Sequence, residues 1–187
     1  DTIQRDPASG SDIRFMPFLA VSSDESAWAE EMLRSRGIEP GDTVVACHGG
    51  ASDPRRMWPL ECYENVAQAL VSKRGVKTVF FLEPDAPDRK IPVASAVLRT
   101  SLREMMAVLT KCDLLICNDS GPMHIADALG VPVVAVFLTG NPVWHRPYHP
   151  GQKVVGRGTG HDFVIAPTEA GILEAANEQL DARRSAP

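Results

Sequence analysis

Apolar runs of four to six residues alternate with amphipathic segments along most of the chain. Four of these runs are apolar at nearly every position rather than at every second one. Continuous apolarity is typical of parallel strands that are buried on both faces of a sheet. The pattern predicts strands at residues 43–48, 78–82, 113–117 and 132–137, and two shorter strands at 93–98 and 154–155.

Between the runs, apolar residues recur every three or four positions, which predicts helices. The predicted helices cover residues 24–36, 59–74, 101–111 and 168–183, and a short helix is expected after Asp119. Ser101 and Glu104 have the spacing of a capping box. The side chains expected to face the core include Trp28, Met32 and Leu33 in the first helix, Tyr63, Val66, Ala67, Leu70 and Val71 in the second, and Leu102, Met105, Met106 and Leu109 in the third.

Strands that alternate with helices at this spacing predict an α/β fold, a Rossmann-like parallel sheet with helices on both faces. Residues 1–22 are irregular and are predicted to be a linker or tail, so that residues 23–187 form one domain. The loops after the strands gather at the carboxyl edge of such a sheet, where ligands bind. Prolines break two of these loops, 83–92 and 138–152, and no regular helix is expected in either.

The composition is that of a globular protein, with 44% hydrophobic and 23% charged residues. The net charge of −5 argues against non-specific binding to nucleic acid. The four cysteines have no CxxC spacing and are expected to be buried or half-buried thiols of a reducing compartment: Cys47, Cys62, Cys112 and Cys117. Without a signal peptide or an apolar run of about 18 residues, a soluble, cytosolic protein is expected. Because the chain begins at Asp1, it is expected to be a piece of a longer protein.

The strongest candidate for a binding site is the turn from Asn118 to His124, which lies between a predicted strand and a short helix. The amides of Ser120 and Gly121, the Ser120 hydroxyl and the helix dipole suit an anion such as a phosphate. His124 is expected to donate a hydrogen bond to a phosphate oxygen. Asp119 is an awkward neighbour for an anion and is expected to cap the helix or to stabilise the loop. The alternative is an ordinary capped helix with a core histidine.

A second candidate is the loop that follows the first strong strand. It carries Gly49-Gly50 and Arg55-Arg56, a combination that suits a polyphosphate because arginine can bind two phosphate oxygens at once. The alternative is a solvated loop with surface arginines. The motifs GxxxxGK[ST] and GxGxxG are both absent, which weakens the hypotheses of a nucleoside triphosphatase and of a dinucleotide-binding enzyme.

The loop 138–150 carries several polar and aromatic side chains, including His145 and His149. Their spacing of four would suit a metal pair only on a helix, which the prolines oppose. A contact to a sugar or an acceptor, or an interdomain surface, is expected instead. The local sequence contains no Ser-His-Asp or Cys-His arrangement.

Taken together, the motifs resemble glycosyltransferase family 9, the ADP-heptose:lipopolysaccharide heptosyltransferases and their relatives. The resemblance runs from about residue 40 to about residue 155 and covers the C-terminal, donor-binding half of a GT-B enzyme. The segments that carry it are His48-Gly49-Gly50-Ala51, Arg56-Met57-Trp58-Pro59, Thr100-Ser101-Leu102-Arg103-Glu104, the turn Asn118–His124, and Ala128-Leu129-Gly130-Val131-Pro132.

The resemblance implies a role for particular residues. The donor diphosphate would lie against Gly50, Ala51, Arg56, Asp119, Ser120, Gly121, Pro122 and His124, with Arg56 where the family often has a lysine. The nucleoside would lie near Glu83, Asp85 and Thr100, and the loop 138–150 would close over the donor sugar. Two departures from the family pattern are Leu138-Thr139-Gly140, in place of Gly-Pro-Thr, and a helix that is deleted or collapsed between residues 85 and 98.

The leading functional hypothesis is therefore the donor-binding domain of an inverting, metal-independent glycosyltransferase without a cofactor. It would use a nucleotide diphosphate sugar, ADP-heptose above all, to modify the lipopolysaccharide core or a related glycan. The catalytic base and the acceptor site would belong to an N-terminal half outside this chain, and the whole protein would work in the cytoplasm at the inner face of the membrane. The alternatives are a non-catalytic sugar-nucleotide-binding or interaction module and a GT-B relative such as a sugar-nucleotide epimerase.

Overall fold

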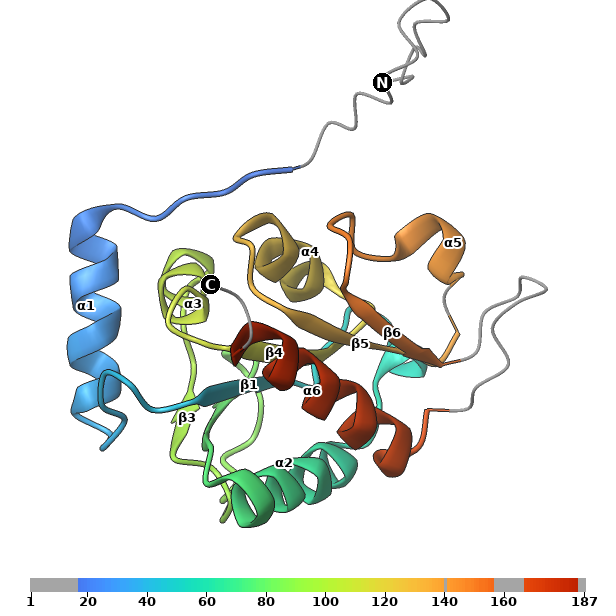
Figure 1. Ribbon diagram of the computed structural model, residues 1–187, viewed down its shortest axis with the longest axis horizontal. Coiled ribbons are helices and arrows are strands. Elements are labelled where there is room, and N and C mark those ends of the chain that lie inside the picture. Colours follow the sequence, from blue (N-terminus) through green and yellow to red (C-terminus); the bar gives the residue numbers. More distant parts are fainter. Residues whose placement is uncertain (1–16, 140, 157–166, 185–187) are drawn as a thin grey trace, which may run out of the picture.

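A computed structural model describes residues 17–139, 141–156 and 167–184. Its centre is a six-stranded sheet in the order β3-β2-β1-β4-β5-β6, in which every pair of neighbours is parallel (Figure 1). The sheet order could not be read from the local pattern. The strands are β1 (Val44–His48), β2 (Lys77–Phe81), β3 (Ala96–Leu98), β4 (Leu114–Asn118), β5 (Val133–Phe137) and β6 (Lys153–Gly156).

The continuously apolar runs form parallel strands, as predicted, and these strands lie in the middle of the sheet. Every residue of β1, β4 and β5 is buried, because helices cover both faces of these strands. The predicted strand at 93–98 is shorter than expected and begins at Ala96. Residues 82–100, all of them described, contain no helix, so the collapse expected between residues 85 and 98 is confirmed.

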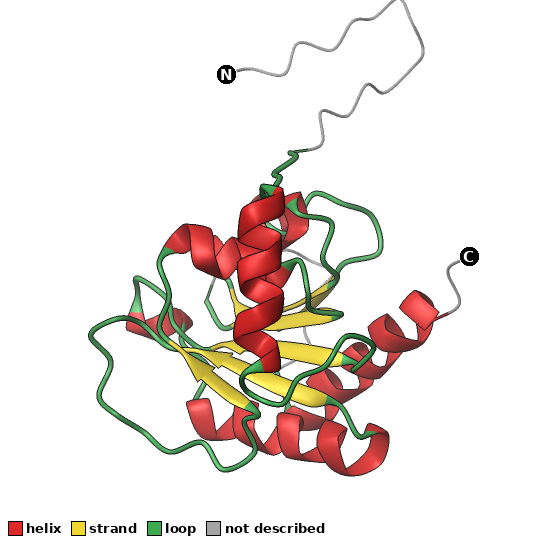
Figure 2. Ribbon diagram, turned by 90° about the vertical axis from the view of Figure 1, so that its left-hand side faces the viewer, coloured by secondary structure: helices red, strands yellow, loops and turns green. Residues whose placement is uncertain are grey.

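Two layers of helices enclose the sheet, which Figure 2 shows edge-on between them. On one face, α2 and α6 cover a core that includes Tyr63, Phe80 and Leu180; on the other, α1, α3 and α4 cover a core that includes Leu33 and Phe137. The prediction of helices on both faces is therefore confirmed. The long helices are α1 (Ser23–Arg34), α2 (Leu60–Arg74), α3 (Leu102–Leu109), α4 (Gly121–Ala128) and α6 (Glu169–Arg184).

Three details of the prediction were wrong. Leu102 is 58% exposed because it occupies the first position of α3, before the turn that reaches the core. Trp28 is 40% exposed because Ala29 and Leu33, four positions apart, form the buried stripe of α1 instead. A single helical turn, α5 (Pro142–His145), lies in the segment expected to be irregular. A proline is well suited to the first turn of a helix, where its missing N–H has no partner to lose.

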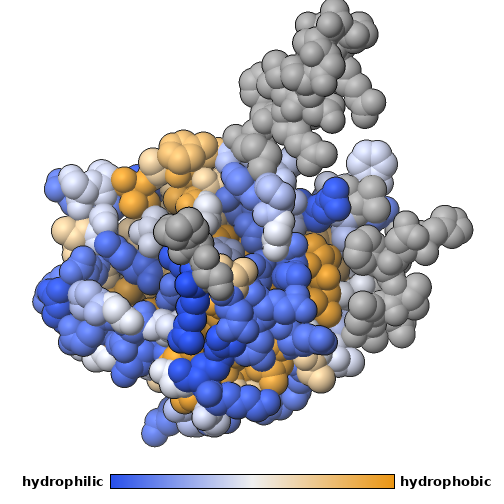
Figure 3. Space-filling model, viewed as in Figure 1, coloured by the Kyte–Doolittle hydropathy of each residue, from blue (hydrophilic) through white to orange (hydrophobic). Residues whose placement is uncertain are grey.

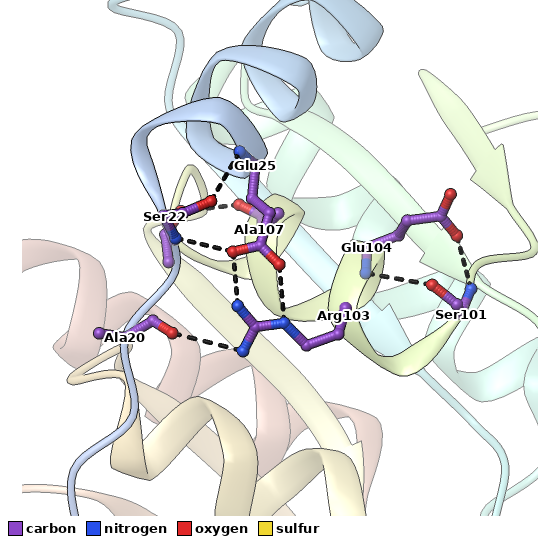
Figure 4. A network of polar contacts seen from close by, with 8 residues as sticks. Ala20, Ser22, Glu25, Ser101, Arg103, Glu104 and Ala107 are labelled. Atoms are coloured by element: carbon purple, nitrogen blue, oxygen red, sulfur yellow. Dashed lines mark hydrogen bonds and ion pairs between the residues drawn. The ribbon is translucent and has the colours of Figure 1, made fainter.

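A polar network fastens α1 to α3 (Figure 4). Ser22 and Glu25 form a capping box at the start of α1, and Ser101 and Glu104 form the predicted one at the start of α3. Arg103 Nε donates to Glu25 Oε1 at 2.7 Å, and its Nη1 donates to the Ala20 carbonyl at 3.5 Å. The hydrogen bonding of Arg103 to the Glu25 carboxylate, helped by the Ser22 amide, lowers the pKa of Glu25 to about 2. The segment that leads into α1 is thus held against the domain.

The face of the molecule in Figure 3 is mainly hydrophilic, with smaller apolar areas between the polar ones. Within the described ranges, no helix is both long enough and apolar enough to span a bilayer. The cysteines are free thiols: Cys47, Cys112 and Cys117 are buried and Cys62 is partly buried, as predicted. The division into a tail at residues 1–22 and a domain at 23–187 stays a prediction, although α1 does begin at Ser23.

Candidate functional site

A cleft of about 270 Å³ lies at the carboxyl ends of β1 and β4. The strand order reverses between these two strands, since β2 and β3 extend the sheet on one side and β5 and β6 on the other. This is the position at which open α/β sheets bind ligands. The lining residues are His48, Gly50, Ala51, Ser52, Arg56, Glu83, Asp119, Ser120, Gly121, Pro122, His124 and His145.

Asn118, the fully buried last residue of β4, ties the two main loops of the cleft together. Its Oδ1 accepts hydrogen bonds from the Trp58 amide at 3.0 Å and the Tyr63 hydroxyl at 2.8 Å, and its Nδ2 donates to the Gly49 carbonyl at 2.7 Å. Every partner belongs to the loop after β1 or to the helix behind it. The position of that loop relative to α4 therefore depends on one amide side chain.

The N-terminus of α4 opens into the cleft. Its N-cap is Ser120, whose side chain makes no capping hydrogen bond and instead donates to the Asn118 carbonyl at 3.2 Å. A Cβ added to Gly121 would meet nothing within 4 Å, so a ligand can approach the backbone there. Of the two roles expected for Asp119, capping the helix was wrong, because Asp119 lies one residue before the N-cap, while stabilising the loop stays a prediction.

Asp119 instead faces Arg56 across the cleft. The Arg56 Nη1 lies 3.6 Å from Asp119 Oδ2, which is beyond hydrogen-bond distance, and that buried oxygen has no hydrogen-bond partner among the described residues. Arg55 points elsewhere: it is 81% exposed and pairs with Asp53 at 2.8 Å. Of the two neighbouring arginines, only Arg56 is thus available to an anion in the cleft.

His48 and Glu83 form the opposite end of the cleft, at the ends of β1 and β2. The His48 Nε2 lies 3.4 Å from Glu83 Oε1, and its buried Nδ1 has no hydrogen-bond partner in the described part of the chain. A Cβ at Gly50 would lie 2.3 Å from Glu83 Oε1 and 3.0 Å from His48 Cε1. Glycine at position 50 therefore leaves room for the Glu83 carboxylate.

Because His48 is buried, the stability of the fold is expected to depend on pH. Burial lowers the pKa of His48 below its ordinary 6.5, although Glu83 opposes the shift. Between pH 7 and 5 the unfolded chain then binds this proton more readily than the folded chain does, so stability falls as the pH falls, by at most about 1.4 kcal/mol per pH unit. Urea denaturation across this range measures the slope.

His48→Gln is expected to remove this part of the slope, whereas His124→Gln, a change at an exposed position, is expected to keep it. Glu25 and Asp53 do not interfere, since partners hold the pKa of each at about 2 and their contribution is lost only below about pH 4.5. An unchanged slope in His48→Gln would contradict the assignment.

The third side of the cleft comes from α5, which follows β5. His145, the last residue of α5, lines the cleft, while the neighbouring Trp144 is 77% exposed. The Tyr148 ring lies 6.5 Å from the His124 ring, centroid to centroid. This segment therefore meets α4 beside the cleft, as a loop that contacts a bound molecule would.

The structure brings together most of the residues predicted from the sequence. The described residues contain no group of three His, Cys, Asp or Glu side chains close enough to hold a metal ion, and metal independence stays a prediction. Asp85 and Thr100 do not line the cleft, and their nucleoside role stays a prediction too. His145 belongs to the loop expected to contact a sugar or an acceptor and also lines the cleft, whereas His48 and Ser52 line it without having been assigned a role. The residues expected to bind the diphosphate or the nucleoside that line the cleft are Gly50, Ala51, Arg56, Glu83, Asp119, Ser120, Gly121, Pro122 and His124.

Comparison with known proteins gives a consistent result. The family model of glycosyltransferase family 9 (heptosyltransferase) matches residues 15–170. The lipopolysaccharide core heptosyltransferase OpsX of Haemophilus influenzae is 26% identical over 147 residues, which are 73% of this chain and 41% of that protein. Lipopolysaccharide heptosyltransferase 2 of Escherichia coli is 24% identical over 160 residues, which are 79% of this chain and 45% of that protein. The chain thus spans less than half the length of these relatives.

Solved structures show the same fold. The glycosyl transferase family 9 structure from Veillonella parvula superposes with a TM-score of 0.76 at 26% identity, over 88% of this chain and 54% of that one. The predicted fold class, a Rossmann-like parallel sheet of the kind found in GT-B glycosyltransferases, is thereby confirmed.

Proposed function

This chain belongs to glycosyltransferase family 9, and on that premise we propose that its cleft binds the diphosphate of a nucleotide-sugar donor. The single observation that carries the proposal is that an arginine faces a helix N-terminus across the cleft. Ser120 and Gly121 open α4 on one side, and the Arg56 guanidinium stands on the other. Backbone amides at a helix N-terminus and a guanidinium are complementary to phosphate oxygens.

The order of the strands suggests how a donor would lie. Along the carboxyl edge, Glu83 follows β2, His48 ends β1, Ser120 follows β4, and His145 comes after β5. A donor whose diphosphate lies between β1 and β4 would place its nucleoside toward Glu83, whose carboxylate can accept hydrogen bonds from ribose hydroxyls. Its sugar would lie toward His145. The names of the heptosyltransferase relatives favour a heptose as the transferred sugar, and we propose ADP-heptose as this donor.

The geometry also suggests the part that this chain plays in transfer. When an acceptor hydroxyl attacks the anomeric carbon from the opposite face, the bond to the diphosphate breaks and negative charge gathers on the leaving oxygens. Arg56 and the α4 N-terminus are placed to stabilise that charge without a metal ion. We propose that the catalytic base and the site for a lipopolysaccharide-core acceptor lie outside this chain, in a cytoplasmic enzyme whose reaction inverts the anomeric centre.

Binding of ADP to the chain, measured by isothermal titration calorimetry, tests the proposal. Arg56→Ala is expected to weaken ADP binding about 10- to 100-fold, because a hydrogen bond to a charged group contributes about 1.5–3 kcal/mol. Arg55→Ala is the matched control, since it removes the same side chain one position away, where the guanidinium faces Asp53.

The two variants distinguish a specific site from a general effect of charge. Equal weakening in both would show that ADP responds only to the net charge of the loop. Absence of ADP binding to the wild-type chain would refute the proposal outright.

A further inference from the structure

A buried carboxylate outside the diphosphate contacts is bonded to the loop that follows α5. Asp127, in the last turn of α4, is 0% exposed. It accepts hydrogen bonds from the Tyr148 amide at 2.6 Å, the His149 amide at 3.2 Å and the Gln152 Nε2 at 3.0 Å. The His149 Nδ1 lies 3.1 Å from its Oδ1. A single side chain of α4 is thus bonded to three residues of the loop that follows α5.

Stability alone does not explain a carboxylate at this position. Burial removes the charge from water, and the C-terminal turn of a helix, with its partial negative charge, is unfavourable for an anion. Replacing all members of a buried ionic group by apolar residues often costs no stability, whereas removing one member leaves its partners unpaired. What an apolar residue could not do is accept hydrogen bonds from consecutive loop amides, so the contribution of Asp127 is the fixed conformation of the loop.

The loop is bonded at a further point, and the fixed part lies close to the cleft. Gln152 also accepts from the Val133 amide at 2.6 Å, which joins it to the start of β5. His145 precedes Tyr148 by three residues, a separation of at most about 11 Å along the chain. Holding the Tyr148 amide therefore restricts where His145 can lie, and His145 lines the cleft.

We propose that Asp127 is a positioning residue for the sugar side of the donor cleft. It anchors residues 148–152 to α4, so that His145 stays at the wall of the cleft toward which the donor sugar would extend. This inference rests on the proposed function and adds a specificity element to it. The helix that offers its N-terminus to the diphosphate also determines, through its last turn, the wall against which the sugar packs.

A first experiment needs no ligand. Amide hydrogen exchange is expected to speed up at Tyr148 and His149 in Asp127→Ala by about 10-fold or more, while the amides of β1 and β4 keep their protection. Asp113→Ala is the matched control, since Asp113 Oδ2 accepts from the Val44 amide at 2.8 Å at the amino ends of β1 and β4, the ends opposite the cleft. Unchanged exchange at Tyr148 and His149, or acceleration spread over the whole sheet, would overturn the anchoring role.

A second experiment compares ADP with ADP-heptose by calorimetry. Asp127→Ala is expected to weaken binding of ADP-heptose about 10-fold and that of ADP less than about 3-fold, because disorder in the loop affects only the sugar. A merely structural role would weaken both ligands equally, and Asp113→Ala is expected to change neither.

The double variant decides whether Asp127 acts through His145. If it does, Asp127→Ala adds little to His145→Ala, and the two effects on ADP-heptose are not additive. Additive effects would show that Asp127 does not act through His145. If the wild-type chain binds neither ADP nor ADP-heptose, the proposed function fails with the sugar-side role, and hydrogen exchange alone then decides whether Asp127 anchors the loop.

Discussion

Asn118→Ala is expected to lower the free energy of unfolding by about 3–5 kcal/mol. The change leaves the Trp58 amide, the Tyr63 hydroxyl and the Gly49 carbonyl without their partner, and each unsatisfied buried group costs about 1–3 kcal/mol. Binding of ADP is expected to fall as well, because the loop that carries Arg56 is no longer fixed relative to α4. Urea denaturation and calorimetry measure the two effects.

Two further variants test this interpretation. Asn177→Ala removes an asparagine of α6 that accepts from Arg74 of α2 and donates to the Leu173 carbonyl within α6, and its cost in unfolding free energy is expected to stay below about 1.5 kcal/mol. Tyr63→Phe removes one of the groups that Asn118 satisfies. When Tyr63→Phe is combined with Asn118→Ala, the loss of unfolding free energy is expected to be smaller than the sum of the losses in the two single variants. A cost of Asn118→Ala no larger than that of Asn177→Ala would contradict the role of Asn118.

Gly156→Ala is expected to destabilise the fold by more than about 3 kcal/mol, from strain of about 1–2 kcal/mol in the left-handed region and from a steric clash. Gly156 ends β6 with φ +144°, and a Cβ there would lie 1.9 Å from the Phe137 carbonyl oxygen and 2.7 Å from its carbon. These are backbone atoms of β5, so no side chain can rotate away. The pairing of β5 with β6 would have to open.

Gly130→Ala separates the two contributions. Gly130 also has a positive φ, +73°, but an added Cβ would meet nothing within 4 Å. Its cost is therefore expected to be only the conformational strain, about 1–2 kcal/mol. Equal urea midpoints for the two variants would show that β6 yields to the added methyl group.

The central strands could be predicted because burial on both faces leaves an unbroken apolar run in the sequence. The same signal fades at the edges of the sheet, where β3 and β6 are short and only part of each strand is buried. α5 was missed because three prolines in its loop argue against a regular helix, whereas Pro142 begins a single helical turn. The order of the strands depends on contacts between distant segments, which no local pattern reports.

The candidate site was predictable where several polar or small residues follow a strand together, as after β4. Functional residues that stand alone in the sequence could not be predicted. His48 stands at the end of an apolar strand and gives no signal of the Glu83 carboxylate beside its ring. Asp127 has the spacing of an ordinary polar position on a short helix, and only the fold shows that the 148–152 loop closes over it. In both cases the sequence pattern failed to reveal a contact between residues that lie 20 or more positions apart.

The Arg56–Asp119 pair gives the cleft an anion of its own. The Asp119 carboxylate, 3.6 Å from the guanidinium, acts as an intramolecular competitor for the phosphate that Arg56 would bind. When a diphosphate binds, Arg56 must therefore replace its contact with Asp119 by a contact with the phosphate. Since added salt screens both the original pair and its replacement, the affinity of this cleft for ADP should depend less steeply on ionic strength than that of an isolated arginine.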